Sequence, residues 1–179
     1  MDVLAHTLWT NALFHFKYAK ERRQRYIAAA FGVVPDLIGF VPLTIYVLYN
    51  RLTLSPGTYQ TYTSWTFTYA EYAYNYTHSF VIFLAALLLV MAIRKGKLYW
   101  PMLGWGLHIL IDIFTHPDFY QTPFLFPLNG YKFYGGISWA HPVFMAINYG
   151  LLIVFYIIIF WYRGKRLKRM FGKHEASTK

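Results

Sequence analysis

The chain has 179 residues, a length typical of one domain, and we treat residues 1–179 as a single unit. Hydrophobic residues make up 57% and charged residues only 13%, against about 25% charged in soluble domains, which favours a membrane protein. Cysteine is absent, which excludes disulfides and thiolate metal sites, so any metal ion would be bound by His, Asp or Glu. The net charge is +10. The positions of the basic residues are explained by membrane topology, as argued below, so we expect no nucleic-acid partner.

The first apolar segment, residues 2–16, is short. Its length of about 15 residues falls below the roughly 20 that a helix needs to span a bilayer. We therefore expect a half-buried helix that enters the membrane from the outer side and ends near the basic residues that begin at Lys17.

Four further apolar segments follow and predict an all-α, multi-pass membrane helical bundle of four transmembrane helices plus the short N-terminal helix. The lipid bilayer is thus the first expected partner. Aromatic residues reach 22% of the chain, and Tyr and Trp favour the membrane–water interface. The four segments are residues 26–49, 80–93, 98–114 and 143–162.

The positions of the basic residues predict the orientation. The long connections 50–77 and 115–142 hold only Arg51 and Lys132, whereas the other basic residues after the first helix gather in clusters. Because positive charge in short loops marks the cytoplasmic side, the chain is expected in the plasma (inner) membrane with its N-terminus outside. Residues 163–179 then form a basic cytoplasmic tail. The main basic clusters are residues 17–25, 94–97 and 163–169.

Two local patterns qualify the helices. Pro35 and Pro42 flank Asp36 in the second segment, and proline bends a helix, so a kink is expected at Asp36. Aromatic residues at three- and four-residue spacing predict one stripe on a helix that continues into residues 80–93. We interpret this stripe as packing or an aromatic belt rather than a ligand surface. It consists of Tyr62, Trp65, Tyr69, Tyr72 and Tyr76.

The stretch 106–117 carries the most informative polar residues. On a helix, His108 and Asp112 are four residues apart and share a face, so they could hold one metal ion. An ionised Asp at the centre of a membrane helix costs roughly 2.5–3.5 kcal/mol, and such residues mark functional sites. The alternative is a hydrogen-bonded His–Asp pair that ties two helices together.

Helical rise estimates how deep each ionisable residue lies. His6 is eleven residues from Lys17, and Asp36 and His108 are equally far from Arg25 and Lys97, which corresponds to roughly 16 Å. The same estimate gives roughly 22–24 Å for Asp112, measured from Lys97, and for His78, measured from Arg94. All five groups therefore share a layer in the outer half of the membrane, and one shared cation would satisfy them together. The predicted metal ligands are His6, Asp36, His78, His108 and Asp112.

These residues suggest a hydrolytic mechanism. A divalent ion with an open position lowers the pKa of bound water towards about 7. Asp36 or Asp112 could act as general base if it is not a ligand, and His116, one turn beyond Asp112, as the acid that protonates the leaving group. His116 could instead be a ligand or an interfacial residue. Phosphoester and lipid-headgroup substrates suit the expected depth, and amides and esters stay open.

The same residues resemble a known family. The order of motifs is similar to that of the membrane-bound metal-dependent hydrolases whose best-known bacterial members are induced in the DNA-damage response. The resemblance runs from His6 to residues 123–127 and implies a small multi-helix membrane protein with a His/Asp metal site, with zinc as the expected ion. That site is also similar to the one in zinc-dependent phospholipases. The motifs are His6, Pro35-Asp36, Thr77-His78-Ser79 and His108-x-x-x-Asp112 with Thr115.

Two positions depart from the family pattern. Many members carry a second acid where this chain has Ile38, and a His-Arg pair where it has Ala73 and Tyr74. We therefore expect at least one metal ion and leave a second one open.

Two other classes of function compete with a hydrolase. Intramembrane Asp and His also serve proton relays and transporters, so an ion- or proton-handling protein is the first alternative. A structural membrane protein with hydrogen-bonded polar pairs and no catalysis is the second. Metal content distinguishes the structural alternative from the other two, and chelator-sensitive hydrolysis distinguishes the enzyme.

Overall fold

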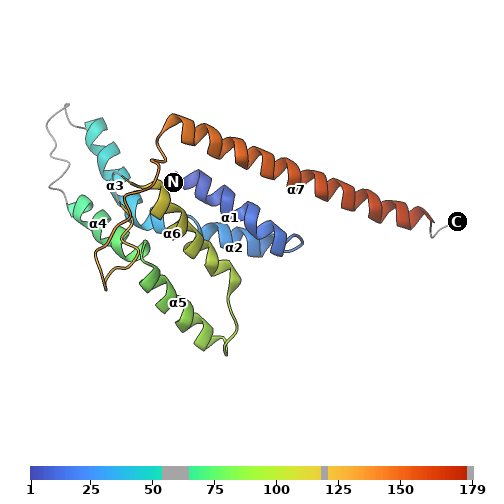
Figure 1. Cartoon of the computed structure of the whole chain (residues 1–179), viewed down its shortest axis with the longest axis horizontal. Coiled ribbons are helices and arrows are strands. Elements are labelled where there is room, and N and C mark those ends of the chain that lie inside the picture. The colour runs from blue at the N-terminus through green and yellow to red at the C-terminus, as the bar shows by residue number, and fades with distance from the viewer. Residues whose placement is uncertain (54–64, 118–120, 177–179) are drawn as a thin grey trace.

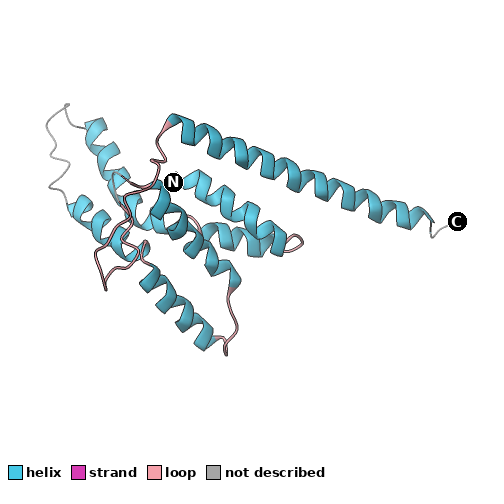
Figure 2. Ribbon diagram, in the orientation of Figure 1, coloured by secondary structure: helices cyan, strands magenta, loops and turns pink. Residues whose placement is uncertain are grey.

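The computed structural model describes residues 1–53, 65–117 and 121–176, and the regular elements in these ranges are all helices (Figures 1 and 2). The predicted all-α class is confirmed. A 3-10 turn, η2 (Trp100–Met102), precedes the sixth helix. The α-helices are α1 (Val3–Lys17), α2 (Arg22–Phe31), α3 (Val34–Thr53), α4 (Trp65–Thr77), α5 (Phe80–Ile93), α6 (Leu103–Thr115) and α7 (Pro142–Ala176).

Helix α1 begins at a side-chain cap. The Asp2 side chain accepts a hydrogen bond from the Ala5 backbone N–H at 2.9 Å, which satisfies one of the free donors of the first turn. The helix packs against α2, α6 and α7. Two polar contacts tie it to α7, because Trp9 Nε1 donates to Asn148 Oδ1 at 2.8 Å and the Tyr149 hydroxyl donates to Asp2 at 2.9 Å. The short N-terminal helix is thus part of the interior of the bundle.

The predicted segment 26–49 is a bent pair of helices. The axes of α2 and α3 differ by 53°. Pro35 is the second residue of α3, where the backbone donor that proline lacks is not needed. The break lies at residues 32–33, and Asp36 is the third residue of the second helix of the pair.

Helices α4 and α5 are bent by 59°, so the continuous helix expected from the aromatic spacing is wrong. The Ser79 hydroxyl accepts hydrogen bonds from the backbone N–H groups of Val81 at 3.1 Å and Ile82 at 3.3 Å, which begins α5 afresh. The described members of the aromatic stripe, from Trp65 to Tyr76, are exposed on α4. Tyr62 lies outside the described residues.

Fewer segments can cross a membrane than the four that we predicted. Within the described ranges, one helix is long and apolar enough to cross a bilayer, at residues 142–162 with a mean hydropathy of 2.5. The bent pairs α2–α3 and α4–α5 are long and apolar enough only when each pair is counted as one span. The described residues then contain up to three membrane spans. The third predicted span, residues 98–114, folds instead as η2 followed by α6. A 13-residue helix is roughly 20 Å long, short of the ~30 Å hydrocarbon core.

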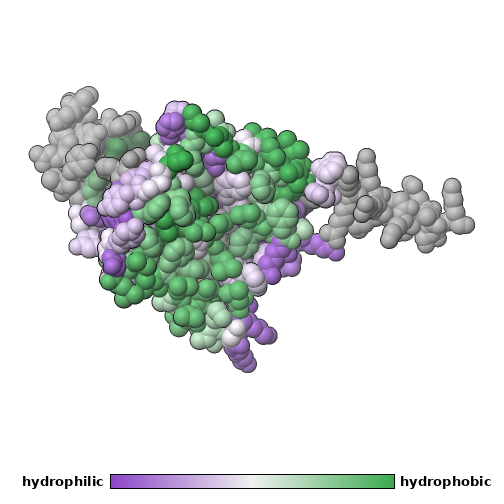
Figure 3. Space-filling view, in the orientation of Figure 1, coloured by the Kyte–Doolittle hydropathy of each residue, from purple (hydrophilic) through white to green (hydrophobic). Residues whose placement is uncertain are grey.

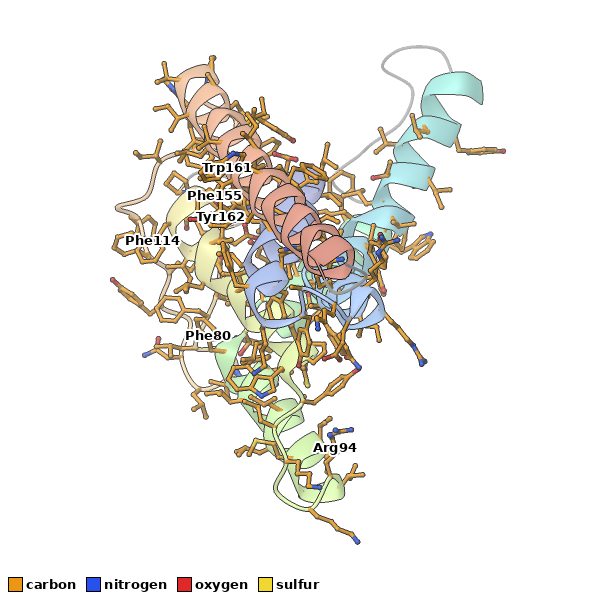
Figure 4. All side chains as sticks on the ribbon, turned by 90° about the vertical axis from the view of Figure 1, so that its right-hand side faces the viewer. Phe80, Arg94, Phe114, Phe155, Trp161 and Tyr162 are labelled. Carbon is orange, nitrogen blue, oxygen red and sulfur yellow. The ribbon has the colours of Figure 1, made fainter. Side chains whose placement is uncertain are left out.

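The surface of the molecule is largely apolar, and buried polar residues lie beside the apolar core. Large apolar side chains such as Leu88 and Ile147 are exposed, and the face in Figure 3 is largely hydrophobic. Phe114, at the edge of the bundle in Figure 4, is exposed as well, whereas Arg94 lies at the opposite end of α5 from Phe80. The interior instead holds fully buried His and Asp residues. An apolar exterior around a polar centre is the arrangement expected in lipid.

Candidate metal centre

The polar centre forms where four parts of the chain meet. His6 comes from α1, Asp36 from the first turn of α3, and His78 from the break between α4 and α5. His108 and Asp112 are one turn apart on α6. All five side chains are buried, and the two bends described above direct Asp36 and His78 towards α6.

Four of the five predicted ligands form a compact group. Asp36, His78, His108 and Asp112 each offer one ligand atom, and these atoms lie within 4.8 Å of one another. His78 Nε2 is 3.4 Å from Asp36 Oδ1 and 3.4 Å from Asp112 Oδ2. His108 Nε2 is 3.6 Å and 3.2 Å from the same two oxygens. The convergence expected from helical depth is therefore observed for these four residues.

The two imidazoles of this group are oriented by the backbone. His108 Nδ1 lies 2.8 Å from the carbonyl oxygen of Gly32, and His78 Nδ1 lies 3.2 Å from that of Tyr74. A carbonyl only accepts, so both rings donate through Nδ1, and in a neutral ring Nε2 then carries the lone pair. The two Nε2 atoms are 2.9 Å apart. Two lone pairs this close repel each other unless a proton or a cation lies between them.

Asp112 has two oxygens in different surroundings. Oδ1 accepts hydrogen bonds from His6 Nε2 at 2.8 Å, from the Thr115 hydroxyl at 3.3 Å and from the amino group of Met1. Oδ2 is buried and has no hydrogen-bond partner among the described residues. It lies 3.4 Å from His78 Nε2 and 3.2 Å from His108 Nε2, so one side of the carboxylate is held and the other is unsatisfied.

These separations fit a divalent cation. Ligand atoms 2.0–2.1 Å from a tetrahedral ion are roughly 3.3 Å from one another. The separations between the imidazole nitrogens, and between them and the carboxylate oxygens, run from 2.9 to 3.6 Å. The unsatisfied Asp112 oxygen and the facing lone pairs are the groups that a cation would satisfy. The cluster could therefore hold a metal ion.

His6 and His116 lie beside this group and face the other oxygen of Asp112. The His6 ring lies against the His108 ring at a centroid distance of 3.9 Å, and its Nε2 is bonded to Oδ1. His116 caps the C-terminal end of α6, with Nε2 3.6 Å from Oδ1 and 2.7 Å from the Met1 amino group. Burial lowers the pKa of His116 to about 4, so its imidazole is neutral at pH 7. His6 thus contacts the held oxygen of Asp112 and is not one of the four residues of the group, although we predicted it as a metal ligand.

Some contacts at the site have no clear signal in the sequence. The Tyr74 ring stacks on the His78 ring at a centroid distance of 3.7 Å. In the sequence, Tyr74 was noted only as a position that departs from the family pattern. Gly32 supplies the carbonyl that orients His108, and a side chain there would collide with Thr10. The Met1 amino group reaches Asp112 across most of the chain. Only Thr115 belonged to a motif noted in the sequence.

The fold and the site together define a class: an all-helical protein with at least one helix able to cross a membrane and a buried His/Asp group that could bind a metal ion. No family model, no curated protein and no solved structure matches the chain.

Proposed function

We propose that the protein is a membrane-embedded metal-dependent hydrolase that acts on a phosphoester or lipid-headgroup substrate at the outer leaflet. The observation that carries the proposal is the close approach of the Nε2 atoms of His78 and His108 to each other and to the unsatisfied oxygen of Asp112. Imidazole and carboxylate ligands without a thiolate suit zinc, which we propose as the ion. We propose one ion, bound by three residues of the group, with the fourth residue in another role.

The roles of the ligands follow from how firmly each is held. Backbone carbonyls orient His78 and His108, and three donors hold Asp112 through Oδ1. Three fixed protein ligands and one open position are the pattern of catalytic zinc sites. Asp36 lies 3.4 and 3.6 Å from the imidazole nitrogens and completes the group, and we assign it the role of general base.

When bound, a divalent cation would polarise both water and a substrate oxygen. The residues then have to move protons around it. Asp36 would accept the proton of the attacking water. His116, which is neutral at pH 7, would take up a proton from solvent and then deliver it to the leaving oxygen. His116 is 9% exposed, whereas His6, His78 and His108 are fully buried, so it is the cluster histidine most accessible to a substrate.

An apolar cavity beside the site favours a lipid over a soluble substrate. Its volume is about 140 Å³, and Pro35 and Thr77 in its wall are the chain neighbours of Asp36 and His78. An acyl chain in this cavity would bring its headgroup towards the cluster. The remaining lining residues are Phe31, Val34, Ile38 and Trp105.

The charge distribution supports a multi-pass orientation with the basic connections in the cytoplasm. In this proposal the bent pairs and α7 lie across the plasma membrane, α6 completes a fourth, shorter segment, and the N-terminus is outside. Figure 1 is consistent with it, since the end of α3 lies at the upper left while the α1–α2 connection and the end of α7 lie to the right.

A proton-handling protein is the second candidate. His116, Asp112 and His6 form a contiguous series, with His6 Nε2 bonded to Asp112 and its ring against that of His108. Chains of Asp and His inside a membrane also carry protons. This candidate predicts proton flux in vesicles that a chelator does not change.

The deciding experiment uses the full chain purified in neutral detergent. We expect it to hydrolyse bis-p-nitrophenyl phosphate or a phosphatidylglycerol, to lose this activity with chelator and to regain it with zinc. His108→Ala should abolish the activity, whereas His141→Ala, an exposed histidine outside the cluster, should leave it unchanged. Activity that persists after complete metal removal, or that is lost equally in both variants, would contradict the proposal.

A further inference from the structure

A second cavity, with polar and apolar walls, lies away from the His/Asp cluster, between α1, α2 and residues 156–160 of α7. Its volume is about 340 Å³. Two arginines from the first half of α2 line it, opposite an apolar wall on α7. Neither arginine takes part in the proposed hydrolysis. The lining residues are Asn11, His15, Arg22, Arg25, Tyr26, Tyr156, Ile159 and Phe160.

Among the residues that the structure describes, Arg25 is a buried cation without a matching anion. It is 7% exposed, and its guanidinium donates one hydrogen bond, from Nη1 to His15 Nδ1. Its Nε is buried and has no hydrogen-bond partner among the described residues. Within the same residues no carboxylate forms an ion pair with Arg25 or Arg22. An uncompensated buried charge is costly, so the cavity calls for an anion.

The arrangement suits a phosphate group. Arg22 and Arg25 are three residues apart on α2 and share a face, and the guanidinium fork matches phosphate oxygens. Arg22 is the first residue of α2, so the positive end of the helix dipole adds to the two charges. Ile159 and Phe160 offer apolar surface next to the cations.

We propose that this cavity binds the phosphate group of an anionic ligand, supplied either by a phospholipid headgroup or by free phosphate. Arg25 holds the phosphate at the buried end and Arg22 at the open end. The site is separate from the metal cluster and would exist even if the protein were not a hydrolase.

The test is calorimetric titration of the purified full chain in neutral detergent. The probes are dihexanoyl phosphatidylglycerol, inorganic phosphate and dihexanoylglycerol, which has the same apolar part without phosphate. Arg22→Gln should weaken the binding of the phosphate-bearing probe roughly tenfold, as expected for the loss of a charge-assisted hydrogen bond. Arg23→Gln removes the same charge from an exposed neighbour that does not line the cavity and should leave the affinity within about twofold, the small effect of a screened surface charge.

The probes also separate the two sources of phosphate. Binding of phosphatidylglycerol alone identifies a lipid headgroup, binding of inorganic phosphate alone identifies a soluble source, and binding of both shows that the phosphate group suffices. Arg25→Gln should abolish binding, and circular dichroism verifies that each variant is folded. Equal weakening by Arg22→Gln and Arg23→Gln, equal binding of dihexanoylglycerol, or no binding of either phosphate probe would overturn the proposal.

Discussion

Replacement of Asp112 by Asn should remove most of the stabilisation that a bound metal ion confers. The change keeps the shape of the side chain but removes the charge of the oxygen that faces His78 and His108. Loss of a residue that only orients a ligand weakens metal binding 10–100-fold, so loss of the ligand itself should cost at least about 100-fold.

The size of the effect follows from linkage. At a metal concentration of about 100 Kd, wild-type protein gains about 2.7 kcal/mol, whereas a 100-fold weaker variant gains only about 0.4 kcal/mol. For a chain of this size, 1 kcal/mol corresponds to roughly 2–4 °C in Tm. Zinc should therefore raise the Tm of the wild type by roughly 5–11 °C and that of Asp112→Asn by roughly 1–2 °C.

The assay is thermal unfolding in detergent, with zinc and with chelator. Thr115→Val serves as the matched control, because it removes one donor to Oδ1 and leaves the cluster-facing oxygen unchanged. It should retain a shift between those of the wild type and Asp112→Asn. A zinc-dependent shift of full size in Asp112→Asn would refute the reasoning.

Three further predictions test neighbouring features. Asp36→Asn should abolish hydrolysis but retain bound zinc in elemental analysis, and loss of both would make Asp36 a ligand rather than the base. Gly104→Ala should lower the stability by roughly 1–3 kcal/mol in thermal unfolding, because its Cβ would lie 2.3 Å from a backbone oxygen of α2. Gly150→Ala, which meets nothing within 4 Å, should not. A cysteine at Asn129 should react with an impermeant reagent on intact cells, and one at Lys95 only after lysis; the reverse pattern would overturn the orientation.

The metal cluster was largely predictable because ionisable residues are costly in an apolar segment. His108 and Asp112 share a helix face by spacing alone, and depth along the helices brought Asp36 and His78 to the same layer. Depth does not fix the direction in which a side chain points. His6 therefore came out at the right level but contacts Asp112 Oδ1 instead of joining the group.

The helix breaks were harder to predict. The aromatic spacing continues past residue 77, which favoured one long helix, whereas the break at His78 depends on the Ser79 cap and on tertiary contacts. The kink that the prolines predicted at Asp36 lies instead at residues 32–33, just before Pro35, and Pro42 lies inside α3. Close contacts such as that of Gly32 with Thr10 depend on how helices meet and have no local signature.

The most direct test of the metal centre is X-ray absorption at the zinc edge of the purified, zinc-loaded chain. Our account predicts one zinc per chain with nitrogen and oxygen ligands at about 2.0–2.1 Å and the outer-shell scattering of two imidazole rings, from His78 and His108. A spectrum of hydrated zinc without imidazole scattering, or with the imidazole signal unchanged in His108→Ala, would contradict it.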